Sequence, residues 1–158
     1  VKGRAEVVPT GRDFTVVIDY AHTPDGLENI CRTLRECCQG RLVTVFGCGG
    51  DRDRTKRPKM GAVAASLSDY LVVTSDNPRS EEPGAIIQDI LAGLQDTKTP
   101  YTVVENRVEA IHWAIAHAQS GDTILLAGKG HETYQVLKDE VIHLDEREVV
   151  ADALAALQ

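Results

Sequence analysis

The sequence predicts an α/β fold: a Rossmann-like, mostly parallel sheet with helices on both faces. Three observations lead to this prediction. Five segments are almost wholly apolar and rich in β-branched residues, as strands buried on both sides are. Segments with apolar residues at helical spacing alternate with them. The length of 158 residues is that of one domain with a hydrophobic core of its own.

The first expected strand covers residues 15–20 (TVVIDY) and ends in a loop at 21–25. A helix follows, because apolar side chains recur at helical spacing: Leu27, Ile30, Cys31, Leu34 and Cys38. The second strand is expected at residues 42–46 (LVTVF).

The same alternation continues through the middle of the chain. We expect a helix that starts near Pro58 and carries Met60, Ala64 and Leu67, a strand at 70–74, a helix around 86–94, a strand at 101–104, a helix at 108–118 and a strand at 123–127. Because a helix separates each strand from the next, the strands should be parallel and joined by right-handed crossovers.

The C-terminal part has a different pattern. Residues 134–137 and 141–144 are separated by three polar residues, which predicts a hairpin able to add an antiparallel edge strand to the sheet. A last helix should follow, because Asp145 and Glu148 have the spacing of a capping box. Its buried stripe would consist of Val150, Leu154 and Leu157.

Composition excludes several classes of function. The formal net charge of −7 argues against a nucleic-acid partner, since phosphate backbones are bound by clustered Lys and Arg. No apolar stretch is long enough to cross a bilayer, so we expect no membrane partner. The four cysteines form no C-x-x-C pair and are expected to be reduced core residues of a cytoplasmic protein, with no metal site: Cys31, Cys37, Cys38 and Cys48. The start at Val1 suggests a piece of a longer chain.

Four unusual loops follow the predicted strands. They are DYAHTPD at 19–25, GCGGDRDRTKRP at 47–58, DNPR at 76–79 and GKGHE at 128–132. In open α/β sheets, ligands bind at the carboxyl ends of the strands. These loops are therefore the candidate binding site.

Two nucleotide-binding motifs are absent from these loops. A dinucleotide fingerprint that starts at Gly47 would need glycine at the position of Arg52, which argues against a nicotinamide oxidoreductase. A phosphate-binding loop would need Ser or Thr after Lys129, where Gly130 stands. The glycines themselves have a simpler interpretation as a turn that requires positive φ: Gly47, Gly49 and Gly50.

The charges in the loops fit the end group of an amino acid. The guanidinium groups of Arg52 and Arg79 are suited to carboxylates, and Pro78 restricts the conformation of Asn77 before it. Glu132 could accept from an ammonium.

Simpler interpretations stay open at this point. The side chains of Asp76 and Asn77 could serve only to satisfy backbone groups of their loop. His22 and His131 have no evident partner for triad chemistry and are more often structural.

Together the four loops resemble the C-terminal domain of the Mur ligases, and most closely that of the members that add diaminopimelate. The similarity spans nearly the whole chain, from GRAEV at 3–7 through FGCGGDRDRTKRPKMG at 46–61 to GKGHE with Tyr134 and Gln135. It implies that residues 1–10 are a linker from a missing central domain and that residues 11–158 are the amino-acid-binding domain.

The resemblance also implies a reaction. The γ-carboxylate of D-glutamate in UDP-N-acetylmuramoyl-L-alanyl-D-glutamate would become an acyl phosphate, which the amine of meso-diaminopimelate attacks. ATP and Mg²⁺ would be bound mainly by the central domain, so the present chain alone should not turn over. Carried over by position, the diaminopimelate contacts are Arg52, Asp76, Asn77, Pro78, Arg79, Gly128 and Glu132. The nucleotide-facing residues are Arg4, Asp19 and His22, and no catalytic residue or metal ligand is expected.

Two alternatives remain. A related ligase such as folylpolyglutamate synthetase shares the architecture but takes glutamate, and the pairing of DNPR with GKGHE argues against it. The chain could instead be a small-molecule-binding module without a catalytic role. For the diaminopimelate assignment the decisive residue is Arg79, because lysine lacks a distal carboxylate for it.

Overall fold

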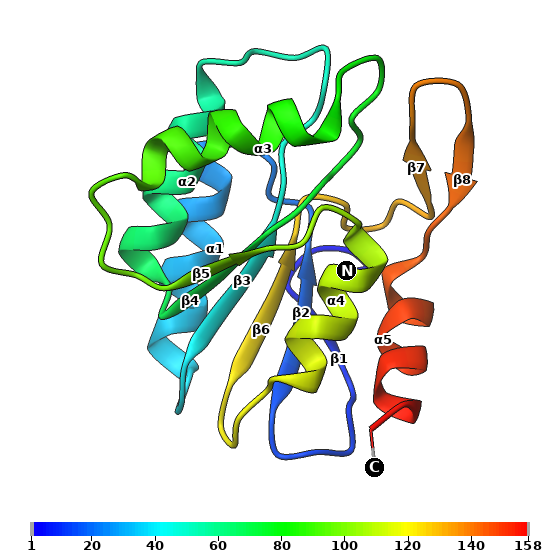
Figure 1. Cartoon of the computed structure of the whole chain (residues 1–158). Helices are drawn as coiled ribbons and strands as arrows, with labels where there is room; N and C mark the ends of the chain where they lie inside the picture. Colours follow the sequence, from blue (N-terminus) through cyan, green and yellow to red (C-terminus); the bar gives the residue numbers. More distant parts are fainter. Residues whose placement is uncertain (1, 158) are drawn as a thin grey trace.

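The computed structural model describes residues 2–157, and its main sheet has six strands in the order β1-β2-β6-β3-β4-β5 (Figure 1). Their bounds are β1 Glu6–Val8, β2 Thr15–Asp19, β3 Leu42–Phe46, β4 Tyr70–Val73, β5 Tyr101–Val103 and β6 Thr123–Ala127. Every neighbouring pair is parallel except β1 with β2. The predicted α/β class with a mostly parallel sheet is confirmed.

Helices cover both faces of the sheet (Figure 1). One face is covered by α1 (Pro24–Cys37), α2 (Lys56–Leu67) and α3 (Pro83–Leu91), with a short 3₁₀ turn at Ala92–Leu94. The other face is covered by α4 (Arg107–Ala116) and α5 (Glu146–Ala155). The central strands β3 and β6 are buried at every position, because apolar cores lie above and below them.

Side-chain caps determine where three helices begin. The hydroxyl of Thr23 accepts from the backbone at the start of α1, and Asn106 does the same for α4. Asp145 caps α5 as predicted, since its side chain accepts from the backbone N–H of Arg147. Glu148 does not complete a capping box; it binds the ring of His143 at 2.8 Å instead.

The C-terminal hairpin, β7 (Tyr134–Val136) and β8 (Val141–His143), forms a two-stranded sheet of its own. The hairpin therefore does not add the expected antiparallel edge strand to the main sheet. Strand β7 binds the DNPR loop instead: the backbone N–H of Arg79 donates to Val136 O at 3.1 Å, and the side-chain amide of Gln135 donates to Asp76 O at 2.6 Å. The antiparallel edge is β1, which lies in the segment expected to be a linker.

The prediction that the four cysteines are core residues is right only in part. Cys31 is fully buried, but Cys37 is exposed, because six residues further along the helix it no longer faces the sheet. Cys48 is half-buried beside the loops, and burial raises the pKa of its thiol to about 12. In residues 2–157 no helix is long and apolar enough to cross a membrane.

Candidate functional site

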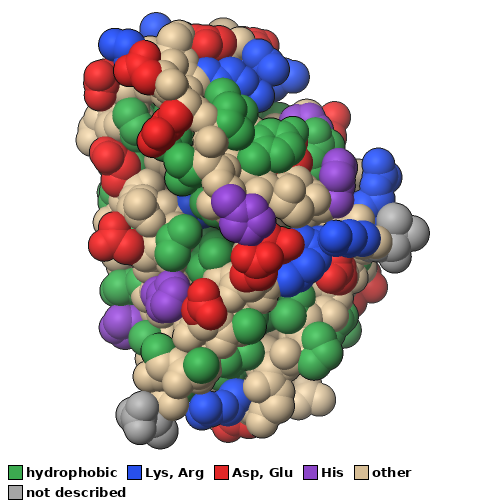
Figure 2. Space-filling model, turned by 90° about the vertical axis from the view of Figure 1, so that its right-hand side faces the viewer, with side chains coloured by type: hydrophobic (Ala, Val, Ile, Leu, Met, Phe, Trp, Pro, Cys, Tyr) green, Lys and Arg blue, Asp and Glu red, His purple; other side chains and the backbone are tan. Residues whose placement is uncertain are grey.

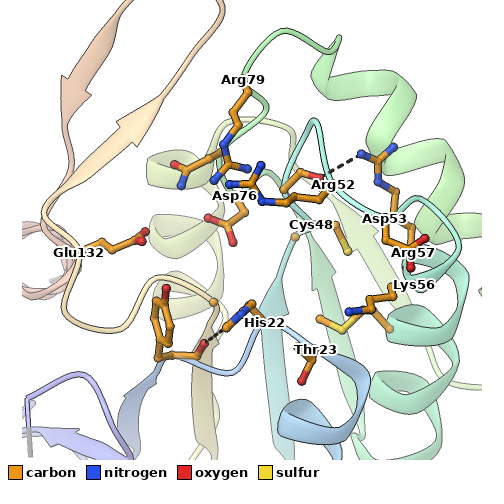
Figure 3. A pocket seen from close by; sticks show the side chains of 16 residues that line it. His22, Thr23, Cys48, Arg52, Asp53, Lys56, Arg57, Asp76, Arg79 and Glu132 are labelled. Carbon is orange, nitrogen blue, oxygen red and sulfur yellow. Dashed lines mark hydrogen bonds between the residues drawn. The ribbon is translucent and has the colours of Figure 1, made fainter.

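A pocket of about 380 Å³ lies at the carboxyl ends of the strands, where the four unusual loops meet (Figure 3). Six of the seven residues predicted to contact diaminopimelate line it: Arg52, Asp76, Asn77, Arg79, Gly128 and Glu132. Pro78 does not line the pocket. Residues that the sequence analysis had not assigned to the site also contribute: Tyr20, Thr23, Asp53, Lys56, Arg57 and Met60.

The glycine-rich loop packs directly on the DNPR loop. A Cβ atom built on Gly50 would overlap the carbonyl of Pro78, and one on Gly49 would lie 2.8 Å from Nη1 of Arg79. Neither Gly47, Gly49 nor Gly50 has positive φ, so the expected reason for these glycines is wrong. Gly47 and Gly50 are needed because backbone atoms of residues 74–78 approach them too closely for any side chain, whereas a Cβ on Gly49 would only displace the end of the Arg79 side chain.

The buried Arg57 anchors the glycine-rich loop, which contains Gly47, Gly49 and Gly50. Its guanidinium is 1% exposed and binds both carboxylate oxygens of Glu81 at 3.0 and 2.8 Å, Asp89 at 2.9 Å and the carbonyl of Gly49 at 3.0 Å. The hydrogen bonds from Arg57 and from the backbone N–H of Asp51 lower the pKa of Glu81 to about 2. Arg57 had appeared in the sequence only as part of a charged run.

Arg79 is held in an uncommon backbone conformation, with φ of +52°. Its Nη1 donates to the carbonyl of Gly50 at 2.9 Å, which directs the guanidinium along the rim of the pocket. A guanidinium has five donors, so most of them are left for a ligand. Arg52 is exposed on the opposite loop, and its Nη1 donates to Asp51 O at 3.0 Å. Two arginines therefore approach one pocket, as the sequence analysis predicted.

Lys129 joins the DNPR and GKGHE loops: it contacts three residues that line the pocket but does not line the pocket itself. Its side chain is fully buried, and Nζ lies 2.9 Å from Asn77 Oδ1, 3.4 Å from Asp76 Oδ1 and 3.3 Å from Glu132 Oε1. In the sequence, Lys129 stands out only as part of an incomplete phosphate-binding motif. The available signal was a lysine between two glycines after an almost wholly apolar strand.

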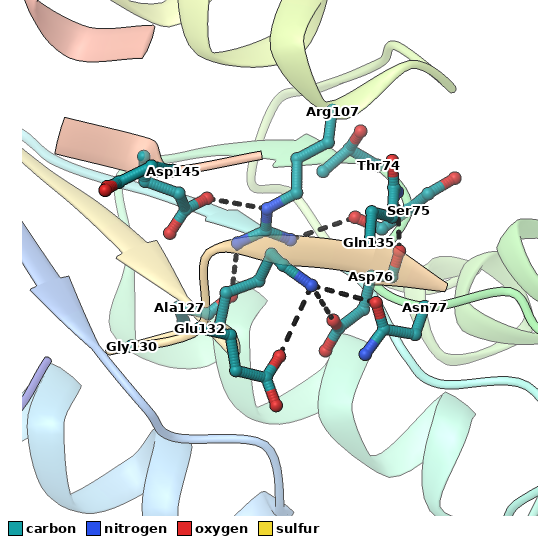
Figure 4. Close-up of polar contacts among 12 residues, drawn as sticks. Thr74, Ser75, Asp76, Asn77, Arg107, Ala127, Gly130, Glu132, Gln135 and Asp145 are labelled. Atoms are coloured by element: carbon teal, nitrogen blue, oxygen red, sulfur yellow. Dashed lines mark hydrogen bonds and ion pairs between the residues drawn. The ribbon is translucent and has the colours of Figure 1, made fainter. Parts of the chain in front are cut away.

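Behind the pocket, Arg107 and Glu146 form an ion pair of 2.7 Å with both side chains fully buried. Arg107 also donates to the carbonyls of Ser75 at 2.9 Å and Ala127 at 2.8 Å (Figure 4). These carbonyls end the segments that lead into DNPR and GKGHE. Arg107 thus joins the two binding loops from the opposite side to Lys129, and no sequence signal had indicated it.

The three residues predicted to face the nucleotide line a second hollow of about 370 Å³: Arg4, Asp19 and His22. This hollow shares Tyr20, His22 and Thr23 with the larger pocket, so the two sites are adjacent. Both carboxylate oxygens of Asp19 accept backbone hydrogen bonds, from Ala5 at 2.7 Å and Ala21 at 2.9 Å. Asp19 therefore shapes the loop that forms the hollow.

Figure 2 shows the face that carries α5 and the hairpin, where Lys and Arg side chains are interspersed with Asp and Glu. On the face shown in Figure 2, the basic residues form no continuous stripe. This mixed distribution is consistent with the formal net charge of −7.

Comparison with known proteins identifies the family. The sequence model of the Mur ligase, glutamate ligase domain matches residues 3–130, most of the chain. The chain belongs to the Mur ligase family. Among relatives of this Mur ligase domain, the UDP-N-acetylmuramoyl-L-alanyl-D-glutamate--2,6-diaminopimelate ligase of Caldanaerobacter subterraneus subsp. tengcongensis is 58% identical over 155 residues, which are 98% of this chain and 32% of the relative. The protein of the same name in Trichormus variabilis is 57% identical over 156 residues, 98% of this chain and 31% of the relative.

Solved structures agree. A solved structure of a UDP-N-acetylmuramoyl-L-alanyl-D-glutamate--2,6-diaminopimelate ligase superposes on this chain with a TM-score of 0.90 at 39% identity. The match covers 99% of this chain and 32% of that chain. A folylpolyglutamate synthase/dihydrofolate synthase from Yersinia pestis, with a TM-score of 0.63 and 21% identity over 99% of this chain and 31% of that chain, shares the fold alone. The chain thus spans about a third of the length of the relatives that it matches.

Proposed function

We propose that this chain is the amino-acid-binding domain of a ligase that joins meso-diaminopimelate to UDP-N-acetylmuramoyl-L-alanyl-D-glutamate in peptidoglycan synthesis. The observation that carries the proposal is the convergence of Arg52, Asn77, Arg79 and Glu132 on one pocket. Two guanidinium groups and one carboxylate complement a ligand with two carboxylates and an ammonium. The names of the relatives at 58% and 57% identity support the same substrate.

In the proposed complex, the far end of diaminopimelate lies at the base of the pocket. Its carboxylate accepts from Arg79 and from the side-chain amide of Asn77, and its ammonium donates to Glu132 and the carbonyl of Gly128. Arg52 binds the carboxylate at the other end. Gly128 has φ of +119°, and a Cβ there would come within 3.0 Å of Asp76 Oδ2, so only glycine leaves this wall open.

ATP would bind beside this pocket, against Arg4, Asp19 and His22, with most of its contacts made by the rest of the ligase. Mg²⁺ would accompany the ATP and would be held mainly by the rest of the ligase, as the resemblance to other Mur ligases implies. Closure of this domain onto the rest of the ligase would exclude water from the acyl phosphate. Mixed with ATP, Mg²⁺ and both substrates, the chain alone should release no phosphate.

The test is a titration of the ¹⁵N-labelled chain, followed by NMR, with meso-diaminopimelate and separately with L-lysine. Shifts should concentrate around Arg52, Asn77, Arg79 and Glu132 with diaminopimelate, and lysine should bind about tenfold more weakly or worse, because it leaves Arg79 without an anion. Arg79→Met should remove this preference, whereas Arg12→Met, at an exposed arginine away from the pocket, should not change it.

Two results would count against the proposal. An equal response to lysine in the unmodified chain would contradict the role of Arg79 in specificity. A lack of response to both ligands at millimolar concentrations would contradict the assignment of the amino-acid site to this chain.

A further inference from the structure

Lys129 contacts three side chains that line the pocket: Asp76, Asn77 and Glu132. Each contact restricts what the pocket can bind. Its ammonium is fully buried, and its closest contact is Asn77 Oδ1 at 2.9 Å. The backbone N–H of Val136 donates to the same oxygen at 3.0 Å. An ammonium and a backbone N–H can only donate, so both require the oxygen of the Asn77 amide at this position. The amide nitrogen must then point away from them.

The orientation of Asn77 decides which ligand group can bind beside it. An amide nitrogen donates hydrogen bonds and cannot accept them. Asn77, which lines the pocket, therefore offers a donor to a carboxylate and nothing to an ammonium. The amide in the reverse orientation would prefer an ammonium.

The charges at the base of the pocket lead to the same conclusion. Asp76 and Glu132 bring two carboxylates close to one another, and Lys129 pairs with both, at 3.4 and 3.3 Å. Without Lys129, neither carboxylate would keep its ion pair with an ammonium, and this part of the pocket would be more favourable for a cation and less favourable for a carboxylate. The ammonium of Lys129 contacts Oε1 of Glu132 and makes no hydrogen bond with Oε2.

We propose that Lys129 is the positioning residue that makes this pocket selective for an end group carrying both a carboxylate and an ammonium over one carrying an ammonium alone, such as the side-chain end of lysine. Together with the backbone N–H of Val136, it directs the nitrogen of Asn77 toward the ligand carboxylate, and its charge neutralises one of the two acidic side chains. It also orients Glu132 toward the ligand ammonium. The inference rests on the function proposed above, and it assigns to Lys129 the choice between diaminopimelate and lysine-like ligands.

The experiment compares the dissociation constants of meso-diaminopimelate and L-lysine for the unmodified chain and for Lys129→Met, by NMR titration. The variant should bind diaminopimelate at least about tenfold more weakly, the effect of losing a charge-assisted contact, while its affinity for lysine changes much less. Lys138→Met, at an exposed lysine in the hairpin turn, is the matched control and should retain full selectivity. A merely structural role would weaken both ligands equally.

Thermal unfolding verifies that each variant is folded at the titration temperature. If Lys129→Met is unfolded, Lys129→Gln, which keeps a donor but not the charge, is measured with the same expectation. The unmodified chain supplies a third readout, since the side-chain amide signals of Asn77 should shift with diaminopimelate and not with lysine. Unchanged selectivity in a folded variant, or an Asn77 amide that ignores diaminopimelate, would overturn the inference while the proposed function stands. Absence of binding in the unmodified chain would instead refute the proposed function.

Discussion

Replacing Arg107 with methionine should be among the most destabilising single changes in this fold. The substitution keeps a long, flexible side chain but leaves the carboxylate of Glu146 buried without its partner. One oxygen of Glu146, Oε1, already accepts no hydrogen bond from the described residues. The carbonyls of Ser75 and Ala127 also lose their donors from Arg107.

The magnitude follows from these contacts. Breaking a buried ion pair by removing one partner costs about 3–5 kcal/mol, against a total free energy of unfolding of about 5–15 kcal/mol for a domain. With a urea dependence of about 2 kcal/mol per molar, the midpoint of unfolding should fall by roughly 1.5–2.5 M. The double variant Arg107→Met/Glu146→Leu should recover part of the loss, because no unpaired charge is left in the core.

Urea unfolding followed by the fluorescence of Trp113 measures these differences. The control is Arg35→Met, which removes an ion pair with Asp69 whose side chains are both 41% exposed and should cost less than about 1 kcal/mol. A loss for Arg107→Met as small as that of the control would refute the argument from burial. So would a double variant less stable than the single one.

Three further predictions concern the loops and their supports. Gly50→Ala should destabilise the chain and weaken diaminopimelate binding, because the new methyl group meets the carbonyl of Pro78; a thermal melt and the NMR titration would detect both effects. The pKa of Glu81 lies at about 2, below its usual value of 4.5, so its contribution to stability is complete above pH 4.5 and disappears as the pH falls through about 2. Melting temperatures across this range should fall less steeply in Glu81→Gln, and an identical pH profile would contradict the ion pair with Arg57. Thr23→Ala removes the cap of α1 and should cost about 1 kcal/mol in urea unfolding, whereas Thr23→Ser should be nearly neutral.

Much of the fold follows from the amino-acid sequence alone. The almost wholly apolar strands at Leu42–Phe46 and Thr123–Ala127 lie within the predicted bounds, because such a run is typical of a strand buried on both faces. The four loops that follow the strands do meet at one pocket, since parallel strands bring their carboxyl ends to the same edge. The residues proposed to bind diaminopimelate could be named from the sequence because their motifs are local, and six of the seven line the pocket.

Tertiary structure decided what depends on contacts between distant segments. The strand β1 is short and half-exposed, with no apolar run to predict it, and it is stabilised by pairing with β2 and by Arg147, which binds Glu6 at 2.7 Å across most of the chain length. Arg57 and Arg107 have no local pattern that separates them from solvated charges, and the two glycines that flank Lys129 do not by themselves show that it is buried. The burial of all three side chains is possible only because carboxylates and carbonyls from other loops surround them, and this is a property of the folded chain.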